Sequence, residues 1–445
     1  MKNNSLNISQ EEYRARRAQL MASMEPHGIA ILSAAPHYKR NNDTEYTYRQ
    51  TSDFYYLTGF NFPDAILLLV PGRAKGEFIL FNQEKDPVSE TWTGIRPGQV
   101  GAVEHFLADE SFAVGTFSEK LPDYLKGCKR IYYAFDRDGA LEKIIQKTLS
   151  TLRDKNRSGV ETPSEFFNLE TLVHDMRLRK SDNEIAVMQR VANISALAHI
   201  RAMKACKPGL YEHDLCAEII YACMKEGVNH QAYPPIVAGG ENACILHYVD
   251  NNKRLPDHGL VLIDAGGELD NYAADITRTF PVNGKFNVEQ RAIYNAVLKT
   301  QLAVIALIAP GVRRDALEKK AIETITTELM ALGLLKGDLA TLIQEKTYTA
   351  FYMHRIGHWL GLDVHDVGSY YIKEQSRVLE HGMVLTVEPG LYIAPDNMNV
   401  DKKWRGIGVR IEDDVVVTAE GHEVLSSAAP KTIEAIEALM NANTL

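Results

Sequence analysis

The stretch Leu260–Phe280, LVLIDAGGELDNYAADITRTF, decides the fold of the C-terminal half of the chain. Its pattern predicts two strands joined by a turn rich in glycine, asparagine and aspartate. With the turn centred between Leu269 and Asp270, Asp264 and Asp275 lie opposite each other across the ladder. Directly paired like charges destabilise a sheet, and two carboxylates buried side by side need a proton or a cation between them. Because the residues before Asp264 are wholly apolar, we expect a buried functional site here rather than two exposed acids.

A second segment, Met353–Gly368 or MHRIGHWLGLDVHDVG, follows the hairpin. It carries three histidines, His354, His358 and His365. The first two have helical spacing, but Gly357 and Gly361 argue against a regular helix. A single histidine is more often a satisfied core residue than a ligand, whereas three so close together favour a site. His354 and His358 need not both bind metal.

Two acid-bearing strands come later in the chain. Val384–Pro389, VLTVEP, is apolar up to Glu388, and Gly408–Val417, GVRIEDDVVV, places Arg410 and Glu412 on one face by its period of two. An isolated buried glutamate is costly, so a shared counter-ion accounts for both glutamates.

The candidate site therefore holds four carboxylates and at least one histidine from well-separated strands. The neighbouring acids Asp413 and Asp414 are interpreted as solvent-facing side chains at a strand break. Carboxylate-dominated ligation favours a hard divalent ion such as Mn²⁺ over a thiolate zinc site. Two metals about 3.5–4 Å apart, bridged by carboxylates, suit the attack of a bridging hydroxide on a carbonyl. The inventory thus predicts hydrolysis.

The length of 445 residues predicts two domains. Short β-rich runs alternate with helical stretches in the first third of the chain, which predicts an α/β domain. The polar segment Lys155–Pro163 is predicted to begin a linker, and the capping box at Ser181 predicts a long helix that runs to about Cys206. We place the boundary near residue 172, which gives domains of residues 1–172 and 173–445.

The second domain shows signs of an internal duplication. Pro208-Gly209 and Pro310-Gly311 each close one long helix and open another. A His-Gly pair followed by three apolar residues leads to Asp264, and the same pattern leads to Glu388. Two helix-plus-strand halves related by a pseudo-twofold axis would each supply a carboxylate at a strand end.

Composition excludes several classes of protein. The formal charge of −9 argues against a nucleic-acid partner, which calls for a basic face. The five cysteines form an odd set without CxxC spacing, which predicts reduced thiols rather than disulfides. The N-terminus lacks the apolar core of a signal peptide, and the longest apolar run is far shorter than the roughly 20 residues that cross a bilayer. We therefore expect a cytoplasmic protein with no membrane partner.

The order of the five candidate ligands resembles that of the metallopeptidase family with the pita-bread fold: Asp264, Asp275, His358, Glu388 and Glu412. The strings ENACILHY, DAGGELDNYAADITRTFPVNGKF, HWLGLDVHDVG, VLTVEPGLYIAP and RGIGVRIEDDV are similar to those of bacterial Xaa-Pro aminopeptidases. QTSDFYYLTGF and ETWTGIRPG are similar to the N-terminal domain of those enzymes. The resemblance covers nearly the whole chain. It implies an α/β (α+β) protein, in which an α/β domain precedes a pita-bread catalytic domain of the creatinase and aminopeptidase type with pseudo-twofold symmetry.

The resemblance also implies roles for individual residues. One metal would be held by Asp264, Asp275 and Glu412, and the other by Asp275, His358, Glu388 and Glu412. A bridging hydroxide would be the nucleophile, with Glu388 as general base and His365 polarising the scissile carbonyl. The remaining implied site residues line the substrate site, orient the ligands or lie near the metals: His247, His354, Arg410 and Tyr233.

The implied substrates are peptides with an N-terminal X-Pro pair. An X–Pro bond has no N–H, so peptidases that need that donor are poorly suited to it. The implied cofactors are two divalent ions, with Mn²⁺ favoured and Co²⁺ and Zn²⁺ as alternatives. A homo-oligomer, dimer or tetramer, is also implied. In it Trp92 would contribute to substrate binding in a neighbouring subunit's cleft, unless Trp92 is an ordinary, partly buried core residue.

Three other functions compete with this hypothesis. A prolidase shares the fold and metals but must hold the free carboxylate of a dipeptide, which demands extra basic residues and a closed cleft. A binding module that has lost its ligands, or a metal-free hydrolase similar to creatinase, is disfavoured because all five ligands are present. The strings ETWTGIRPG and HWLGLDVHDVG favour the aminopeptidase over the prolidase.

Overall fold

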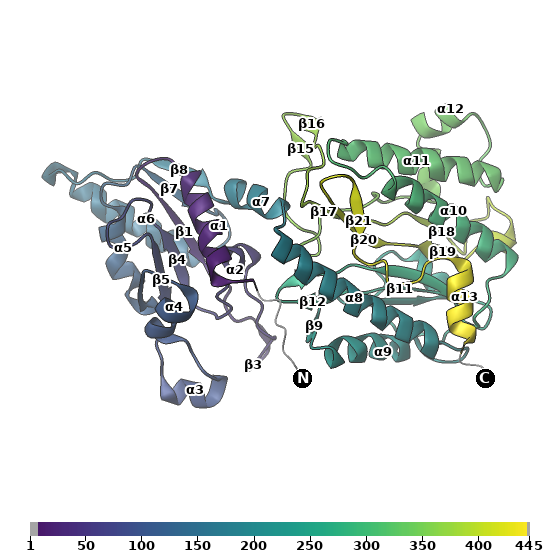
Figure 1. Ribbon diagram of the computed structural model, residues 1–445, viewed down its shortest axis with the longest axis horizontal. Coiled ribbons are helices and arrows are strands. Elements are labelled where there is room, and N and C mark those ends of the chain that lie inside the picture. The colour runs from purple at the N-terminus through teal and green to yellow at the C-terminus, as the bar shows by residue number, and fades with distance from the viewer. Residues whose placement is uncertain (1–7, 443–445) are drawn as a thin grey trace. The chain divides into compact units, whose positions relative to one another are not determined.

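The computed structural model describes residues 8–442, which form two compact units, residues 8–177 and 178–442 (Figure 1). The predicted boundary at residue 172 falls inside helix α7 (Glu170–Leu178), a few residues before the division between the units. No helix of the described residues is long and apolar enough to cross a membrane.

The N-terminal unit is built on a mixed sheet of six strands in the order β6-β5-β4-β1-β7-β8. Strand β1 lies at its centre, antiparallel to β4 and parallel to β7. The bounds are β1 Gly28–Ser33, β4 Ile66–Leu69, β5 Phe78–Asn82, β6 Glu110–Ala113, β7 Arg130–Tyr133 and β8 Glu165–Asn168. A separate exposed hairpin joins β2 (Lys39–Asn41) to β3 (Thr44–Glu45).

Helices complete this unit and confirm the predicted α/β domain. Besides α7 they are α1 Gln10–Ala22, α2 Ser52–Thr58, α3 Pro87–Thr93, α4 Gly98–Phe106, α5 Phe117–Leu125 and α6 Gly139–Asp154. Ser9 caps α1 by accepting a hydrogen bond from the backbone N–H of Glu12. The core packs apolar side chains of the strands, such as Ile31 and Phe81, against Leu121 and Leu149 of the helices.

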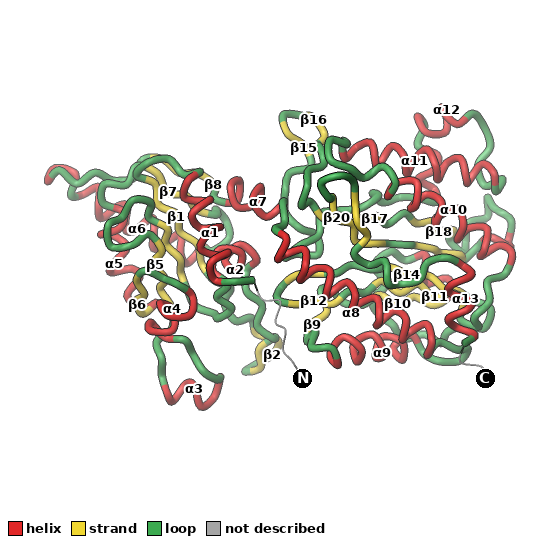
Figure 2. Tube along the Cα trace, viewed as in Figure 1, coloured by secondary structure: helices red, strands yellow, loops and turns green. Residues whose placement is uncertain are grey.

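The C-terminal unit consists of two similar halves, each with a pair of long helices and a three-stranded antiparallel sheet. The first half has α8 Asp182–Ala205, α9 Glu212–Lys225, β10 Ile236–Gly239, β11 Leu260–Asp264 and β14 Thr277–Pro281. The second has α10 Val288–Ile305, α11 Arg314–Ala331, β17 Val384–Val387, β20 Asp413–Val417 and β21 His422–Val424. The helices lie on both outer sides of the strands (Figure 2).

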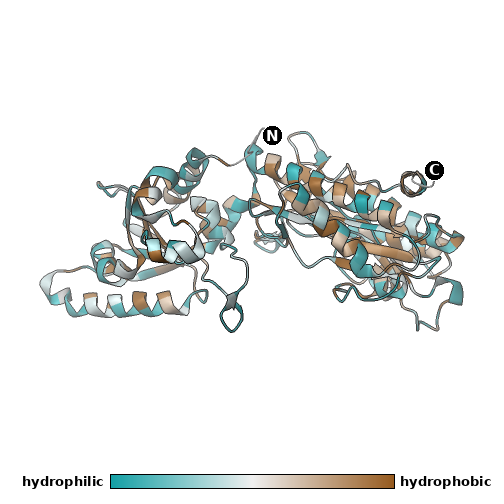
Figure 3. Ribbon diagram, turned by 90° about the horizontal axis from the view of Figure 1, so that it is seen from below, coloured by the Kyte–Doolittle hydropathy of each residue, from teal (hydrophilic) through white to brown (hydrophobic). Residues whose placement is uncertain are grey.

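The remaining elements of this unit are short. They are β9 His230–Gln231, β12 Gly267–Leu269, β13 Tyr272–Ala273, α12 Leu339–Gln344, β15 Tyr371–Ile372, β16 Gln375–Ser376, β18 Gly390–Ile393, β19 Ile407–Arg410 and α13 Ile433–Asn441. The predicted capping box is present at the start of α8, where the Ser181 and Glu184 side chains bond each other's backbone N–H. Hydrophobic residues concentrate on the strands (Figure 3). The arrangement agrees with the predicted pita-bread fold.

The register of the first-half hairpin differs from the prediction. Asp264 lies opposite Thr277, not Asp275, and the turn is centred between Asp270 and Asn271. Both turn residues have positive φ, 48° and 64°, the backbone of a two-residue turn whose twist matches the flanking strands. Asp275 therefore lies two residues before the residue that pairs with Asp264. Because side chains two residues apart point to the same face of an extended chain, Asp275 still lies beside Asp264.

Candidate active site

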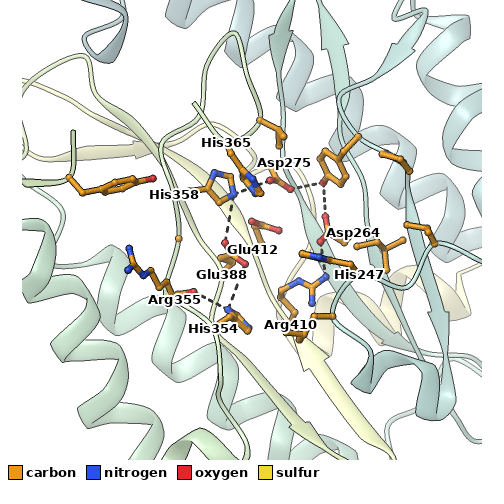
Figure 4. A pocket seen from close by; sticks show the side chains of 18 of the residues that line it. His247, Asp264, Asp275, His354, Arg355, His358, His365, Glu388, Arg410 and Glu412 are labelled. Atoms are coloured by element: carbon orange, nitrogen blue, oxygen red, sulfur yellow. Dashed lines mark hydrogen bonds and ion pairs between the residues drawn. The ribbon is translucent and has the colours of Figure 1, made fainter. Parts of the chain in front are cut away.

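The C-terminal unit contains a cavity of about 490 Å³ that is lined by ten of the eleven predicted site residues (Figure 4). They are Tyr233, His247, Asp264, Asp275, His354, His358, His365, Glu388, Arg410 and Glu412. The eleventh, Trp92, lies on α3 of the N-terminal unit and is 84% exposed, so the alternative of a partly buried core tryptophan is wrong. The other ten residues are far apart in the sequence, between Tyr233 and Glu412, and meet at this cavity.

The segment that carries the histidines is irregular rather than helical, as its glycines indicated. It lies against β17, where the His358 backbone N–H donates to Thr386 Oγ1 (3.1 Å) and the Glu388 N–H donates to the Ile356 carbonyl (2.9 Å). A Cβ at Gly357 would lie 2.0 Å from the Thr386 carbonyl oxygen, so only glycine permits this approach. The contact sets His358 and Glu388 side by side.

One group of potential ligands is compact. Asp275, His358 and Glu412 each offer an atom within 4.8 Å of the others. His358 Nδ1 donates to the Trp359 carbonyl (2.9 Å), which leaves Nε2 facing Asp275 Oδ2 at 3.3 Å and Glu388 Oε1 at 3.7 Å. An imidazole nitrogen between two carboxylates needs a proton or a metal ion. Burial favours the neutral ring, but Asp275 and Glu388 raise the pKa of His358 to about 9.

The carboxylates of the cavity have too little positive charge around them. Burial, followed by the charges of Asp275 and Glu388, raises the pKa of Glu412 well above its ordinary value. Burial raises the pKa of Glu388 to about 7; the charge of His358 lowers it and the charge of Asp275 raises it. Burial also raises the pKa of Asp264, although Arg410 opposes it. A cation would offset this accumulation of negative charge.

Tyr233 connects two of the acids. Its hydroxyl lies 2.6 Å from Asp264 Oδ1 and 2.5 Å from Asp275 Oδ1. A phenol has one proton, so it donates to only one of these oxygens at a time. The second carboxylate therefore lacks a donor at this contact, which again fits a cation held between Asp264 and Asp275.

A chain of hydrogen bonds lies on the other side of the cavity. Arg410 donates from Nη2 to Asp264 Oδ2 (2.6 Å) and from Nη1 to the Tyr392 hydroxyl (2.9 Å). His354 Nδ1 donates to the Arg355 carbonyl (2.9 Å), so its Nε2 accepts from Tyr392 (2.9 Å). Burial, with a smaller contribution from Arg410, lowers the pKa of His354 to about 4, and the ring is neutral at pH 7.

Two residues of this network were not predicted from the sequence. Tyr392 is one. Thr277 is the other, and its hydroxyl donates to Glu412 Oε2 (2.6 Å) while accepting from Arg410 Nε (3.2 Å). Because Thr277 follows Asp275 by two residues on an extended segment, period-two alternation was a usable signal for it. Tyr392 had no such signal, because it depends on the contact of β18 with the histidine segment.

The interpretation of Asp413 and Asp414 as solvent-facing acids is wrong. Asp413 is fully buried, 2.7 Å from Arg278 Nη2 and 2.6 Å from Lys431 Nζ. Asp414 is 1% exposed and accepts from the backbone N–H of Asp275 (3.1 Å). Both faces of β20 are covered, so alternation along the strand does not bring either acid to solvent.

The donor set fits divalent cations. It offers carboxylate oxygens and one imidazole nitrogen, a combination that suits hard or borderline ions. The described residues also include a group of Asp53, Glu170 and His174 in the N-terminal unit, but Arg177 and Arg137 pair with its carboxylates.

Comparison with known proteins agrees with this geometry. The chain matches metallopeptidase family M24 over residues 186–419 and the N-terminal domain of aminopeptidase P over residues 13–132. It is 44% identical to the Xaa-Pro aminopeptidase of Escherichia coli strain K12 over 97% of this chain and 98% of that protein. The structure of Pseudomonas aeruginosa aminopeptidase PepP is similar, with 53% identity, a TM-score of 0.97 and coverage of 98% of this chain and 99% of that one. A zinc-substituted E. coli aminopeptidase P in complex with product has a TM-score of 0.95 at 44% identity, over 98% and 99% of the two chains.

Proposed function

The chain belongs to metallopeptidase family M24 and is a metalloaminopeptidase of the Xaa-Pro aminopeptidase type, and we propose that five side chains of its cavity hold the two cations of that reaction. The convergence of Asp275, His358 and Glu412 within 4.8 Å, in a cavity with a surplus of buried carboxylates, is the observation that carries the proposal. Asp264 would complete one ion's site and Glu388 the other's.

Two bound divalent cations would supply Lewis acidity and lower the pKa of water. The protein residues would orient the site and move protons. Tyr233 and Arg410 hold Asp264 in place. Glu388, whose Oε1 lies 3.7 Å from His358 Nε2, would accept the proton of the attacking water.

The histidines would act on the substrate. His365 lies with its ring centroid 4.3 Å from that of His358, and partial desolvation lowers its pKa. A neutral His365 would donate a hydrogen bond to the scissile carbonyl oxygen and stabilise the tetrahedral intermediate. His354 would be kept in one tautomer by Arg355 and Tyr392, and His247 would line the substrate site with it.

Proline specificity would come from the walls of the cavity. The nitrogen of an X–Pro bond carries no hydrogen, so the enzyme needs no hydrogen-bond acceptor opposite it. Ile236, Leu246 and Val249 line the cavity near His247 and offer apolar surface for the pyrrolidine ring. The released product would be the residue before proline.

Three further properties belong to this proposal. The carboxylate-rich donor set favours Mn²⁺, with Co²⁺ and Zn²⁺ as alternatives. The protein would act in the cytoplasm, without membrane or nucleic-acid partners. It would form a homo-oligomer, dimer or tetramer, through the α3 region, where exposed apolar side chains gather: Val88 71%, Trp92 84% and Ile95 80%.

Hydrolysis of a small peptide panel tests the function. Ala-Pro-Ala-amide should be cleaved after alanine, Ala-Ala-Ala-amide should not, and activity should disappear on chelation and return with Mn²⁺. Asp264→Asn should bind less metal, measured by elemental analysis of the purified protein. Cleavage of the dipeptide Ala-Pro alone would assign a prolidase instead. Activity indifferent to chelation and to Asp264→Asn would exclude a metallopeptidase.

A further inference from the structure

Two arginines line the cavity with side chains that have no part in the mechanism above: Arg314, at the start of α11, and Arg355, next to His354. We propose that they form a carboxylate-binding subsite, so that this enzyme prefers peptides with a negative charge near the scissile bond. The proposal rests on the proposed aminopeptidase function and adds a substrate class to it.

Arg314 is fixed in place although it is charged and buried. It is 7% exposed, and its Nη2 donates to the carbonyl of Gly357, between His354 and His358. Its Cζ lies 4.5 Å from the ring centroid of Tyr370. Tyr370 in turn stacks on Trp359, with centroids 5.3 Å apart and planes at 10°. A guanidinium held by a carbonyl and an aromatic face keeps one orientation.

The positive charge of this cluster is not neutralised by the protein. Among the described residues 8–442 neither guanidinium forms an ion pair with a carboxylate, and Arg314 Nε is buried without a hydrogen-bond partner. Glu318 is the acid whose charge acts on Arg314, but its Oε2 accepts the Ile356 backbone N–H (3.0 Å). A buried charge without a counter-ion is costly, and a ligand carboxylate beside the guanidinium would offset it.

The two arginines act as one cluster. Both line the same cavity, and Arg314 bonds the carbonyl of Gly357, two residues after Arg355 in the chain. Arg355 is exposed and lies on the same side of the cavity as His354 (Figure 4). An incoming carboxylate would therefore meet one exposed arginine and one buried arginine that is held in place. Planar guanidinium groups bind carboxylates through paired, charge-assisted hydrogen bonds.

The carboxylate can come from three places on a peptide, and matched peptide pairs distinguish them. Glu-Pro-Ala-amide against Gln-Pro-Ala-amide tests the side chain of the first residue. Ala-Pro-Glu-amide against Ala-Pro-Gln-amide tests the residue after proline. Ala-Pro-Ala against its amide tests the terminal carboxylate. We expect kcat/KM to be about tenfold higher for the charged member of at least one pair, the ratio that one charge-assisted hydrogen bond supplies.

Charge-removing variants assign the effect to the cluster. Arg355→Gln, at an exposed position, should bring the charged-to-neutral ratio close to one, and Arg314→Gln should do the same. Lys319→Gln is the matched control, because it removes a positive charge from α11 at a side chain that is 77% exposed and away from the cavity. The ratio within each enzyme is compared, so a general loss of activity does not affect the result. If Arg314→Gln fails to fold, Arg355→Gln decides alone.

Ratios below about twofold in all three pairs would overturn the subsite, as would ratios in Arg355→Gln equal to those of the unmodified enzyme. Failure to cleave even Ala-Pro-Ala-amide would instead refute the aminopeptidase function, so the two failures are distinguishable.

Discussion

The hydroxyl of Thr277 shows how much a single uncharged side chain contributes to this site. It donates to Glu412 Oε2 at 2.6 Å and holds a glutamate that is predicted to serve two ions. Outer hydrogen bonds of this kind orient ligands and raise metal affinity. The environment of each carboxylate therefore matters as much as its presence.

Thr277→Val keeps the shape of the residue and removes its hydroxyl. We expect metal affinity to fall by about 10–100-fold, because Glu412 loses its fixed orientation. A competition titration of Mn²⁺ against a chelator measures this. Thr300→Val is the control, since Thr300 is equally buried but bonds only the Ala296 carbonyl within α10. Equal affinities in the two variants would contradict the role given to Thr277.

In the N-terminal unit, neighbouring side chains likewise determine the state of a carboxylate, that of Asp53, which pairs with His174 and Arg177. Burial alone would raise the pKa of Asp53, but hydrogen bonds and charges from His174 (3.1 Å) and Arg177 (2.7 Å) lower it below 3.8. A carboxylate with a lowered pKa contributes stability above its unfolded pKa and loses it as the pH falls through the folded value.

Asp53→Asn should consequently lower the stability of the protein at pH 7 and at pH 5, where the Asp53 carboxylate is charged. The difference from the unmodified protein should shrink below about pH 4, where the unfolded carboxyl becomes protonated. Denaturant unfolding at these pH values measures it, with the exposed Asp43→Asn as control. A difference that grows on acidification would show that the pKa of Asp53 is raised rather than lowered.

At the scale of elements, the site depends on how closely the histidine segment approaches β17. Gly357 allows that approach. Gly266 allows a second close contact, within the first-half hairpin, where a Cβ would lie 1.7 Å from the Ala274 carbonyl oxygen. Backbone contacts of this kind bring His358 Nε2 to 3.3 Å from Asp275 Oδ2 and 3.7 Å from Glu388 Oε1. Neither glycine touches the substrate in the proposed mechanism.

Gly357→Ala should separate the histidine segment from β17. We expect a loss of about 1–3 kcal/mol of stability from overpacking, and a larger proportional loss of activity because His358 and Glu388 move apart. Thermal unfolding and kcat/KM on an Ala-Pro peptide report the two effects. Gly421→Ala is the control, because a Cβ there meets no atom within 4 Å. Unchanged activity in Gly357→Ala would disprove the positioning argument.

At the scale of the whole molecule, the chain combines a catalytic unit with a second unit that has its own core. Helix α3 of that second unit buries no residue, and its large apolar side chains face solvent. Exposed apolar residues gathered in one place usually mark an interface. This observation supports the proposal that copies of the chain associate through α3.

Trp92→Ala should weaken that association. We expect sedimentation analysis to show a smaller species than the unmodified protein at the same concentration, with thermal stability of the unit little changed because Trp92 is not part of its core. Met398→Ala, which removes a side chain that is 76% exposed in the other unit, is the control. An unmodified protein that is monomeric, or a Trp92→Ala oligomer of unchanged size, would refute the interface.

Residue types and local periodicity were enough to identify much of this protein. They indicated which acids end apolar strands, that glycines interrupt the histidine segment, that Ser181 begins a long helix, and that two α-helical hairpins repeat in the second unit. These features depend on neighbours a few residues away, so the sequence by itself determined them.

Only the tertiary structure decided the hairpin register, the burial of Asp413 and the entry of Arg314 into the cavity. The register follows from the positive φ angles of Asp270 and Asn271, and Asp413 is buried because Arg278 and Lys431 reach it from other elements. Arg314 meets Gly357 and Tyr370 through packing of α11 on a loop more than forty residues away in sequence. Such contacts depend on how segments distant in the sequence pack together, and local patterns in one sequence do not reveal that packing.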